Sequence, residues 1–543
     1  MIIQTILFYI FFSLSIFSII GYGALANINQ TKITSYNIFN FFFFGIIVLL
    51  VISIFYYYLV PNNKVLNLLI FFFGLFLNYK FLLFKNYKII FFISFLLFSG
   101  ILISKTHEDF SVYHFQLIKE LSDGYIKFGL SNLDPRYFYS SIFSFIQTLY
   151  IFPYFDYYLV NIPSYLIFVC LVGYLFVEIL KKKINSISLF FLIFLIVKFK
   201  RFSEFGYDYI SQFILIYIFI EYIYKNIVKN DFTAKINSII FFSYSILIKV
   251  SNIYFAPIFL FIFSFKIKSI SKIILSKKFL IFNILFLLIF TFNSFIKTGC
   301  LNYFIKKSCF EKKLTWVIDY KIVEDTKSLS INWARGFYHQ DEKKLSEKEY
   351  NYSYNWINNW FKKHFIPKVF PNIIIIFLIL FTINFIIGKN KVRSSKYNKI
   401  LFYIFISNLI WLYFFPQFRF GIAGISILSF LVFEKIFQQS NEFNFFRMKI
   451  LIILCLLYFN LSNFQRIHDE FKRDDLYKFT NFPYFNLPKL NFISDEVNGI
   501  QFNISKKNNN FWRTCYNSEK ICVNHDDKVL IEKKGRNLFF IKN

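Results

Sequence analysis

Long apolar runs separated by short polar turns dominate this chain. Many of the runs hold roughly 17 to 22 residues, and about 20 apolar residues in a helix cross the hydrocarbon core of a bilayer. The first run, MIIQTILFYIFFSLSIFSII, lacks a basic leading segment and a small-residue cleavage site, so we expect a retained span and not a signal peptide. The pattern predicts an all-α polytopic membrane protein.

The lengths and flanks of the runs predict about 12 to 14 transmembrane helices, several of them shorter than a full crossing. These spans define an expected transmembrane domain over residues 1–463, followed by a tail over residues 464–543. The expected spans lie near residues 4–24, 38–60, 64–79, 87–104, 156–179, 186–198, 208–224, 236–250, 252–265, 279–296, 369–388, 399–415, 421–437 and 448–463.

Basic residues between the spans predict the orientation of the chain. Clusters of Lys and Arg occur in five loops, at residues 80–88, 181–183, 225–235, 266–278 and 389–399. With the expected spans, all five loops fall on one side, which the positive-inside rule makes cytoplasmic. The N-terminus, the loops 105–155 and 297–368, the short turn 198–207 and the tail then lie outside.

The composition supports this class of protein. Hydrophobic residues make up 57% of the 543 positions, and the mean hydropathy is +0.50. A net charge of +30 could indicate a nucleic-acid-binding protein, but the lysines cluster between spans, where membrane orientation explains them. Because no basic stripe accompanies a recognisable nucleic-acid-binding fold, we expect no nucleic-acid partner.

The tail and the cysteines have patterns of their own. Alternating apolar and polar residues in VNGIQFNIS and KVLIEKK predict a small β-rich region in the tail. Cys300 and Cys309 share an expected outer loop, and Cys515 and Cys522 share the tail. Two close pairs on the expected oxidising side predict two disulfides.

Charged and aromatic residues crowd the point where the fourth apolar run ends, in THEDFSVYHFQ (106–116). The segment contains Glu108 and Asp109, followed by Tyr113 and His114. Ionisable groups at a membrane edge are costly unless they are solvated or functional. A solvated helix end would explain a single charge, but the grouping of acid, phenol and imidazole favours a functional site.

Three further charges stand at expected outer turns between spans. Asp208 begins a span, Lys249 separates two short apolar runs, and Arg419 follows a proline in PQFRFG. A carboxylate can take the proton of an acceptor hydroxyl, and Lys or Arg can bind a phosphate leaving group. Acids and cations beside an apolar scaffold therefore indicate transfer of a sugar from a lipid-linked phosphate.

The run DFSVYHFQLIKELSDGYIKFGLSNLDPRYFYSS resembles the first outer loop of a bacterial family related to the GT-C glycosyltransferases. That superfamily includes aminoarabinose transferases, protein O-mannosyltransferases and oligosaccharyltransferases. The segments SEFGYD, IKVS, NWAR and FPQFRFG, and the cysteine-containing tail, follow in the family's order. The positions in the first loop that carry the resemblance are Asp109, Tyr113, His114, Gly129, Leu130, Asn132, Leu133 and Arg136.

The resemblance implies an integral protein of the bacterial inner membrane that uses a polyprenyl-phosphate sugar donor and a glycan or lipid acceptor at the outer face. Asp109 would be the general base, with the adjacent Glu108 as the alternative. Asp208 would bind the acceptor or a divalent metal, Mg²⁺ or Mn²⁺. The expected substrate-binding residues are Tyr113, His114, Arg136, Lys249, Arg335 and Arg419.

Two other functions remain open from the sequence. O-antigen polymerases and ligases also join lipid-linked sugars, and they use arginines in large outer loops, such as Arg335 in 297–368. A flippase or carrier of lipid-linked glycans would place charges within its spans and show internal symmetry. The candidates here gather at the outer edge, which favours surface chemistry.

Overall fold

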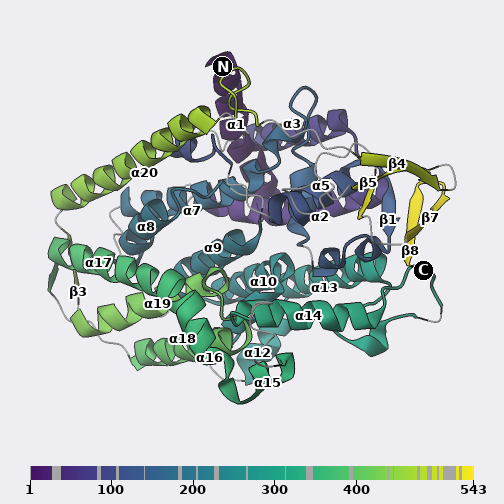
Figure 1. Ribbon diagram of the computed structural model, residues 1–543. Helices are drawn as coiled ribbons and strands as arrows, with labels where there is room; N and C mark the ends of the chain where they lie inside the picture. Colours follow the sequence, from purple (N-terminus) through teal and green to yellow (C-terminus); the bar gives the residue numbers. More distant parts are fainter. Residues whose placement is uncertain are drawn as a thin grey trace.

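The structure is a computed structural model of the chain, and it is largely helical (Figure 1). The described residues are 2–26, 38–81, 87–104, 109–139, 141–180, 186–203, 206–225, 231–263, 267–311, 313–337, 346–389, 395–437, 439–443, 445–473, 477–485, 492–497, 500–505, 521–524 and 529–542.

The first helix packs closely against both the second and the third helix. The three helices are α1 (Ile2–Ala26), α2 (Ile38–Leu59) and α3 (Lys64–Lys80). A Cβ added to Gly23 would lie 1.8 Å from a carbonyl oxygen of α2, and one added to Gly45 would lie 1.8 Å from a carbonyl oxygen of α1. Small residues at such crossings let the backbones of membrane helices approach closely. Close packing of this kind stabilises contacts between apolar helices.

The other long helices surround a buried centre. Helix α7, in the middle of the bundle, is buried over nearly its whole length, whereas α13, α17 and α20 expose many large apolar side chains. The bounds are α4 (Tyr87–Leu97), α7 (Ile162–Leu180), α8 (Ser186–Lys198), α9 (Asp208–Ile218), α10 (Phe232–Ile248), α11 (Pro257–Phe263), α12 (Ile267–Ile274), α13 (Lys277–Thr298), α17 (Phe370–Ile386), α18 (Ser395–Phe414), α19 (Phe418–Phe437) and α20 (Phe445–Arg473).

Within the described residues, seven helices are long and apolar enough to cross a membrane. Apolar surface on the outside of a helical bundle is costly in water and favourable in lipid. The predicted class, a largely helical protein with several helices long and apolar enough to span a membrane, is therefore confirmed at this level. Four shorter apolar helices also occur, at Tyr87–Gly100, Ser186–Lys198, Phe232–Ile248 and Val250–Leu260.

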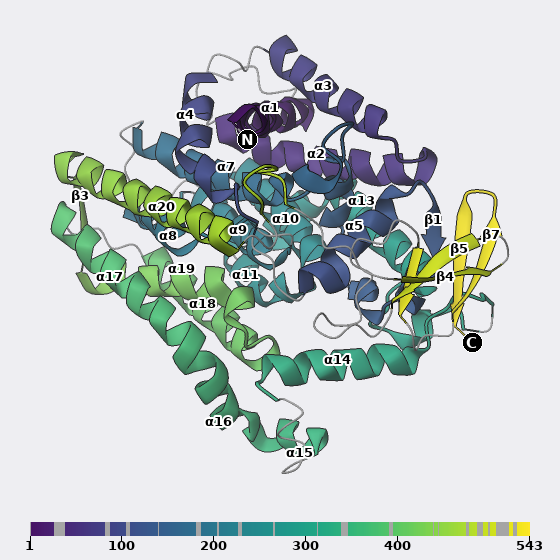
Figure 2. The same ribbon diagram turned by 45° about the horizontal axis from the view of Figure 1, so that its top comes forward.

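Two long connections carry short elements beside the bundle. The first follows α4 and the second follows α13, and α14 of the second connection runs along one edge of the molecule (Figure 2). Their elements are η4 (Phe110–His114), α5 (Phe115–Ser122), β1 (Ile126–Phe128), η5 (Leu130–Asn132), η6 (Pro135–Tyr139), α6 (Phe143–Thr148), α14 (Tyr320–Ala334), α15 (Glu347–Asn351), α16 (Trp356–Trp360) and η13 (Phe361–Val369).

The tail contains β-strands, as the alternation of its residues predicts. Strands β4 (Phe492–Val497), β5 (Ile500–Ser505) and β6 (Ile521–Asn524) form one sheet, with β5 in the middle. Strands β7 (Val529–Lys534) and β8 (Asn537–Lys542) form a hairpin, and β8 also pairs with β1 of the first connection. Strands β2 (Ile387–Lys389) and β3 (Gln439–Phe443), separated in the chain by α18 and α19, form a separate two-stranded antiparallel sheet.

The cysteines follow the expected pairing where the structure describes them. Cys300 and Cys309 form a disulfide in the loop after α13. Cys522 in β6 is disulfide-bonded, whereas Cys515 lies outside the described residues. The remaining cysteines, Cys170 and Cys455, are free thiols inside apolar helices.

Candidate functional site

Four charged side chains from four distant segments meet at one place, and we call them the charged cluster: Asp109, Asp208, Lys249 and Arg419. Lys249 Nζ lies 2.8 Å from Asp208 Oδ1, and Arg419 Nε lies 3.1 Å from Asp208 Oδ2. Arg419 Nη1 lies 3.9 Å from Asp109 Oδ2. The structure therefore brings together two acids and two cations that the sequence singled out separately.

Helix ends position the cluster. Asp208 is the first residue of α9, where a negative charge is favoured by the partial positive charge of the helix N-terminus. Lys249 ends α10 in an extended conformation, with φ −148° and ψ 111°. Arg419 is the second residue of α19, directly after the turn at Pro416. Three helices thus end or begin at the same site.

The two carboxylates of the cluster differ in their surroundings. Each oxygen of Asp208 faces one cation, and its side chain is 15% exposed. The Asp109 side chain is 35% exposed and lies farther from Arg419. Asp208 is therefore suited to hold Lys249 and Arg419 in place, whereas Asp109 is the more accessible acid.

Arg419 is held from two sides. Its Nε donates a hydrogen bond of 2.9 Å to Gln417 Oε1, and its guanidinium carbon lies 4.9 Å from the centre of the Trp333 ring. Within the described chain, neither Nη atom donates a hydrogen bond to a protein acceptor. A guanidinium fixed at Nε presents its two Nη atoms in the geometry that binds phosphate oxygens.

Tyr113 and His114 lie against the cluster. The buried His114 ring is centred 4.2 Å from the Tyr113 ring and 4.9 Å from the ring of Tyr207, which precedes Asp208. Burial, together with the charge of Asp109, raises the pKa of Tyr113 well above its usual value. Its hydroxyl group therefore stays protonated at neutral pH and can donate a hydrogen bond.

Arg136 is near the cluster but already has an anionic partner. Its guanidinium binds the carboxylate of Asp134 through two nitrogen atoms. The same guanidinium lies over the Tyr113 ring at 5.2 Å. Because its charge is neutralised by Asp134, Arg136 is better suited to support Tyr113 than to bind a phosphate.

Arg335 occupies a different environment. The buried guanidinium donates hydrogen bonds to Asn351 and, at 3.1 Å, to the carbonyl oxygen of Tyr413, and it stacks over Trp356 at 4.9 Å. Burial lowers the pKa of Arg335. Among the described residues it forms no ion pair with the cluster. Trp333, two residues earlier in the chain, is the residue of this segment that contacts Arg419.

The sequence predicted Glu108 as the alternative base and Asp208 as a possible ligand of a divalent metal. Glu108 lies outside the described residues, so Asp109 is the acid of the pair that the structure places. Mg²⁺ and Mn²⁺ prefer carboxylate oxygens, but both oxygens of Asp208 already face cations. The described residues contain no group of three potential ligands. Because both of its oxygens face cations, Asp208 in this arrangement is a poor ligand for a divalent metal, and we derive no step through one.

A polar network beneath the cluster was not predicted. Gln212 Nε2 donates to Asn252 Oδ1 at 2.7 Å, and Gln212 Oε1 accepts hydrogen bonds from the Tyr254 hydroxyl at 3.0 Å and the backbone N–H of Ala423 at 3.2 Å. Buried polar groups need such partners. The network links α9, the turn after α10, and α19.

The sequence did contain a signal for this network. Gln212 follows Asp208 by four residues, and Asn252 follows Lys249 by three. Residues at these steps lie one helical turn apart on the same face. Polar side chains one turn below predicted site charges, inside apolar runs, indicate residues that support the site. Trp333 carries no comparable local signal.

The fold and the charged cluster define a largely helical membrane protein with acids and cations gathered at the ends of several helices. A protein-family model described as a domain of unknown function (DUF8201) matches residues 1–426. The chain belongs to this family, and the matched region contains the whole cluster. No curated protein and no solved structure matches the chain.

Proposed function

We propose that the protein is a membrane glycosyltransferase resembling the GT-C superfamily, which moves a sugar from a polyprenyl-phosphate donor to a glycan or lipid acceptor of the cell envelope. The observation that carries this proposal is the convergence of Asp109, Asp208, Lys249 and Arg419. The cluster combines an accessible acid with cations beside an apolar bundle, as a lipid-linked phosphate donor needs.

Each charged group has a role in the transfer. The acceptor hydroxyl oxygen attacks the anomeric carbon of the sugar, and the bond from that carbon to the phosphate oxygen breaks. Asp109 accepts the proton of the hydroxyl. The electron pair leaves with the polyprenyl phosphate, whose charge is stabilised by Arg419 and Lys249. Asp208 orients these two cations.

The location of the cluster supports transfer at the outer face of the inner membrane. The backbone N–H of Gly129 in the first connection donates to the carbonyl oxygen of Ile296, next to the disulfide-containing loop. The Cys300–Cys309 disulfide is typical of an oxidising compartment. The N-terminus and the tail then lie outside. The seven long and four shorter apolar helices of the described residues approach the proposed total of about 12 to 14 spans.

The test replaces Asp109 with Asn in cells that depend on the protein. Mass spectrometry of envelope glycans should show the loss of one sugar, and the lipid fraction should accumulate a polyprenyl-phosphate-linked sugar. Asp156→Asn is the matched control, because Asp156 lies in the same outer connection in an exposed ion pair with Lys64 and contributes little.

The outcome separates the candidate functions. Unchanged glycans in cells that contain Asp109→Asn at the normal abundance would exclude Asp109 as the base. A repeat polymer that becomes short, without loss of a sugar type, would indicate a polymerase instead of a transferase.

A further inference from the structure

The last strand of the chain completes the first connection. Strand β8 (Asn537–Lys542) pairs in parallel with β1 (Ile126–Phe128), and the Phe128 and Phe539 rings stack with centroids 4.8 Å apart. The β1 and β8 ribbons lie side by side in Figure 1. The two strands are about 400 residues apart in sequence, a separation at which pairing depends on the whole fold.

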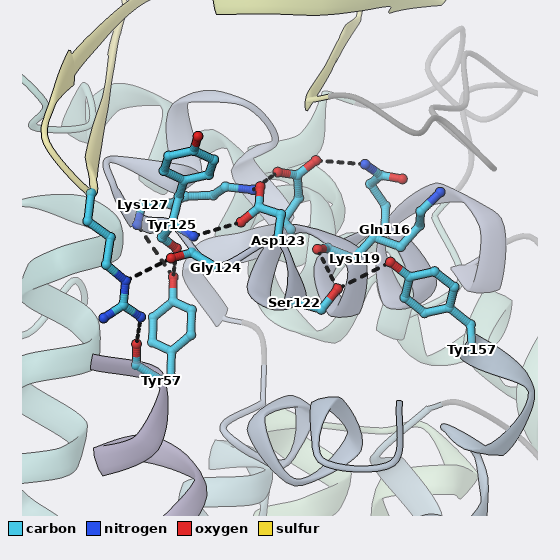
Figure 3. Close-up of polar contacts among 11 residues, drawn as sticks. Tyr57, Gln116, Lys119, Ser122, Asp123, Gly124, Tyr125, Lys127 and Tyr157 are labelled. Atoms are coloured by element: carbon cyan, nitrogen blue, oxygen red, sulfur yellow. Dashed lines mark hydrogen bonds and ion pairs between the residues drawn. The ribbon is translucent and has the colours of Figure 1, made fainter. Parts of the chain in front are cut away.

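Arg536, directly before β8, fixes this strand to the bundle. Its Nε donates to the carbonyl oxygen of Gly124 at 2.7 Å, and its Nη2 donates to the carbonyl oxygens of Tyr57 and Val60, each at 2.6 Å. Figure 3 shows the bonds at Gly124 and Tyr57. These carbonyl groups at the end of α2 lack helical partners, and a cation is favoured there.

One path leads from β1 towards the cluster through buried charges. Lys127 in β1 is fully buried and forms ion pairs with Glu120 and, at 2.5 Å, with Asp123, the residue directly after α5 (Figure 3). Glu120 also accepts a hydrogen bond of 2.7 Å from Gln116. Because α5 continues directly from η4, the position of β1 fixes the segment that carries Tyr113.

A second path leads to the same tyrosine from the other side of β1. Asn132 Nδ2 donates to the carbonyl oxygen of Phe540 in β8 at 2.8 Å and to that of Trp316 at 3.1 Å. The chain then continues to Arg136, whose guanidinium lies over the Tyr113 ring at 5.2 Å. Strand β8 therefore holds the chain on both sides of β1, and both paths end at Tyr113.

We infer that β8 is a positioning element of the candidate site and that Arg536 is the positioning residue that anchors it. The tail, which lies beyond the matched family region, is then structurally part of the candidate site. The consequence for catalysis rests on the proposed transferase function. Without the strand, η4 is no longer held in place, and the separation of 3.9 Å between Arg419 Nη1 and Asp109 Oδ2 is no longer fixed.

The test measures hydrogen–deuterium exchange of the full-length protein in lipid nanodiscs. Arg536→Ala should accelerate exchange in residues 109–122 and 126–133 about tenfold, while α7 and α9 stay protected, because local opening precedes global unfolding. Arg536→Lys keeps the cation and should restore part of the protection. The control is Lys478→Ala, which removes an exposed cation from the same tail.

Asn132→Ala is the second variant, because it removes only two hydrogen bonds and leaves the Arg536 anchor intact. It should accelerate exchange in the same segments to a smaller degree. Normal exchange in residues 109–122 of both variants would overturn the inference. A transfer assay on the same preparations separates the two proposals: wild-type protein without activity would contradict the transferase, whereas the exchange result stands by itself.

Discussion

At the residue scale, the main feature is one carboxylate between two cations. Asp208 faces Lys249 and Arg419, and all three side chains are less than one third exposed. Partly buried charges are expensive unless they are paired, and the loss of one partner costs more than the pair contributes. Asp208 therefore stabilises the fold and also holds Lys249 and Arg419 in the positions from which they could bind an anion.

Asp208→Asn should lower the free energy of unfolding by about 3 kcal/mol, because two cations lose their counter-charge. Thermal unfolding in detergent, followed by tryptophan fluorescence, measures the change. The double variant Asp208→Asn with Lys249→Met should lose less than the sum of the two single variants, since the pair is coupled. Additive losses would contradict the pairing.

At the element scale, close approaches connect the second long connection, the first connection and the tail. Gly129 adopts φ +70°, and a Cβ there would lie 2.5 Å from the carbonyl oxygen of Phe540 and 2.8 Å from Trp316 Cβ. A glycine is required at this position for two reasons: the left-handed conformation and the contact with backbone atoms. The three segments meet where β1 ends.

Gly129→Ala should destabilise the protein by about 3 kcal/mol, as the sum of left-handed strain and overpacking. Gly535→Ala is the control, because Gly535 also has a positive φ, +61°, but no atom lies within 4 Å of its added Cβ. It should cost only about 1 kcal/mol. Equal shifts in melting temperature would show that the contact with β8 does not matter.

At the scale of the whole molecule, the ends of the helices define two faces. The first connection carries Asp109 of the charged cluster, and its Asn132 donates to the carbonyl oxygen of Phe540 in β8. The N–H of Gly129 in the same connection donates to the carbonyl oxygen of Ile296, shortly before the Cys300–Cys309 disulfide. The C-terminal end of α19, which carries the exposed Lys435, lies the length of that helix away from Arg419. A bilayer around the apolar bundle would separate these faces.

Labelling of cysteines on intact bacterial cells tests this arrangement. Asp156→Cys, at an exposed position of the first connection, should react with a membrane-impermeant maleimide, whereas Lys435→Cys should react only after the membrane is disrupted. The Cys300–Cys309 disulfide should resist alkylation without reductant. Labelling of the two positions in the opposite order would place the cluster on the cytoplasmic side.

The sequence was informative about elements and individual charges. The apolar runs predicted the helices, because a run of apolar residues favours a helix from its own composition and length. The alternation in the tail predicted strands for the same local reason. Asp109, Asp208, Lys249 and Arg419 were conspicuous because a charge at the end of an apolar run is costly and therefore rare.

The partners of these residues could not be predicted in the same way. The sequence suggested that Arg136 and Arg335 bind substrate, whereas the structure pairs Arg136 with Asp134 and surrounds Arg335 with aromatic rings. Trp333 was not recognised as the ring that covers Arg419. Such contacts depend on how helices end relative to one another in space.

The sequence by itself determined that the chain forms apolar helices with a few charges at their ends and a β-rich tail, because these properties follow from local composition and period. Only the tertiary structure decided that four charges converge, that Asp208 separates the two cations, and that β8 pairs with β1. Those contacts join segments far apart in the chain, and their free energy appears only when the whole bundle is packed.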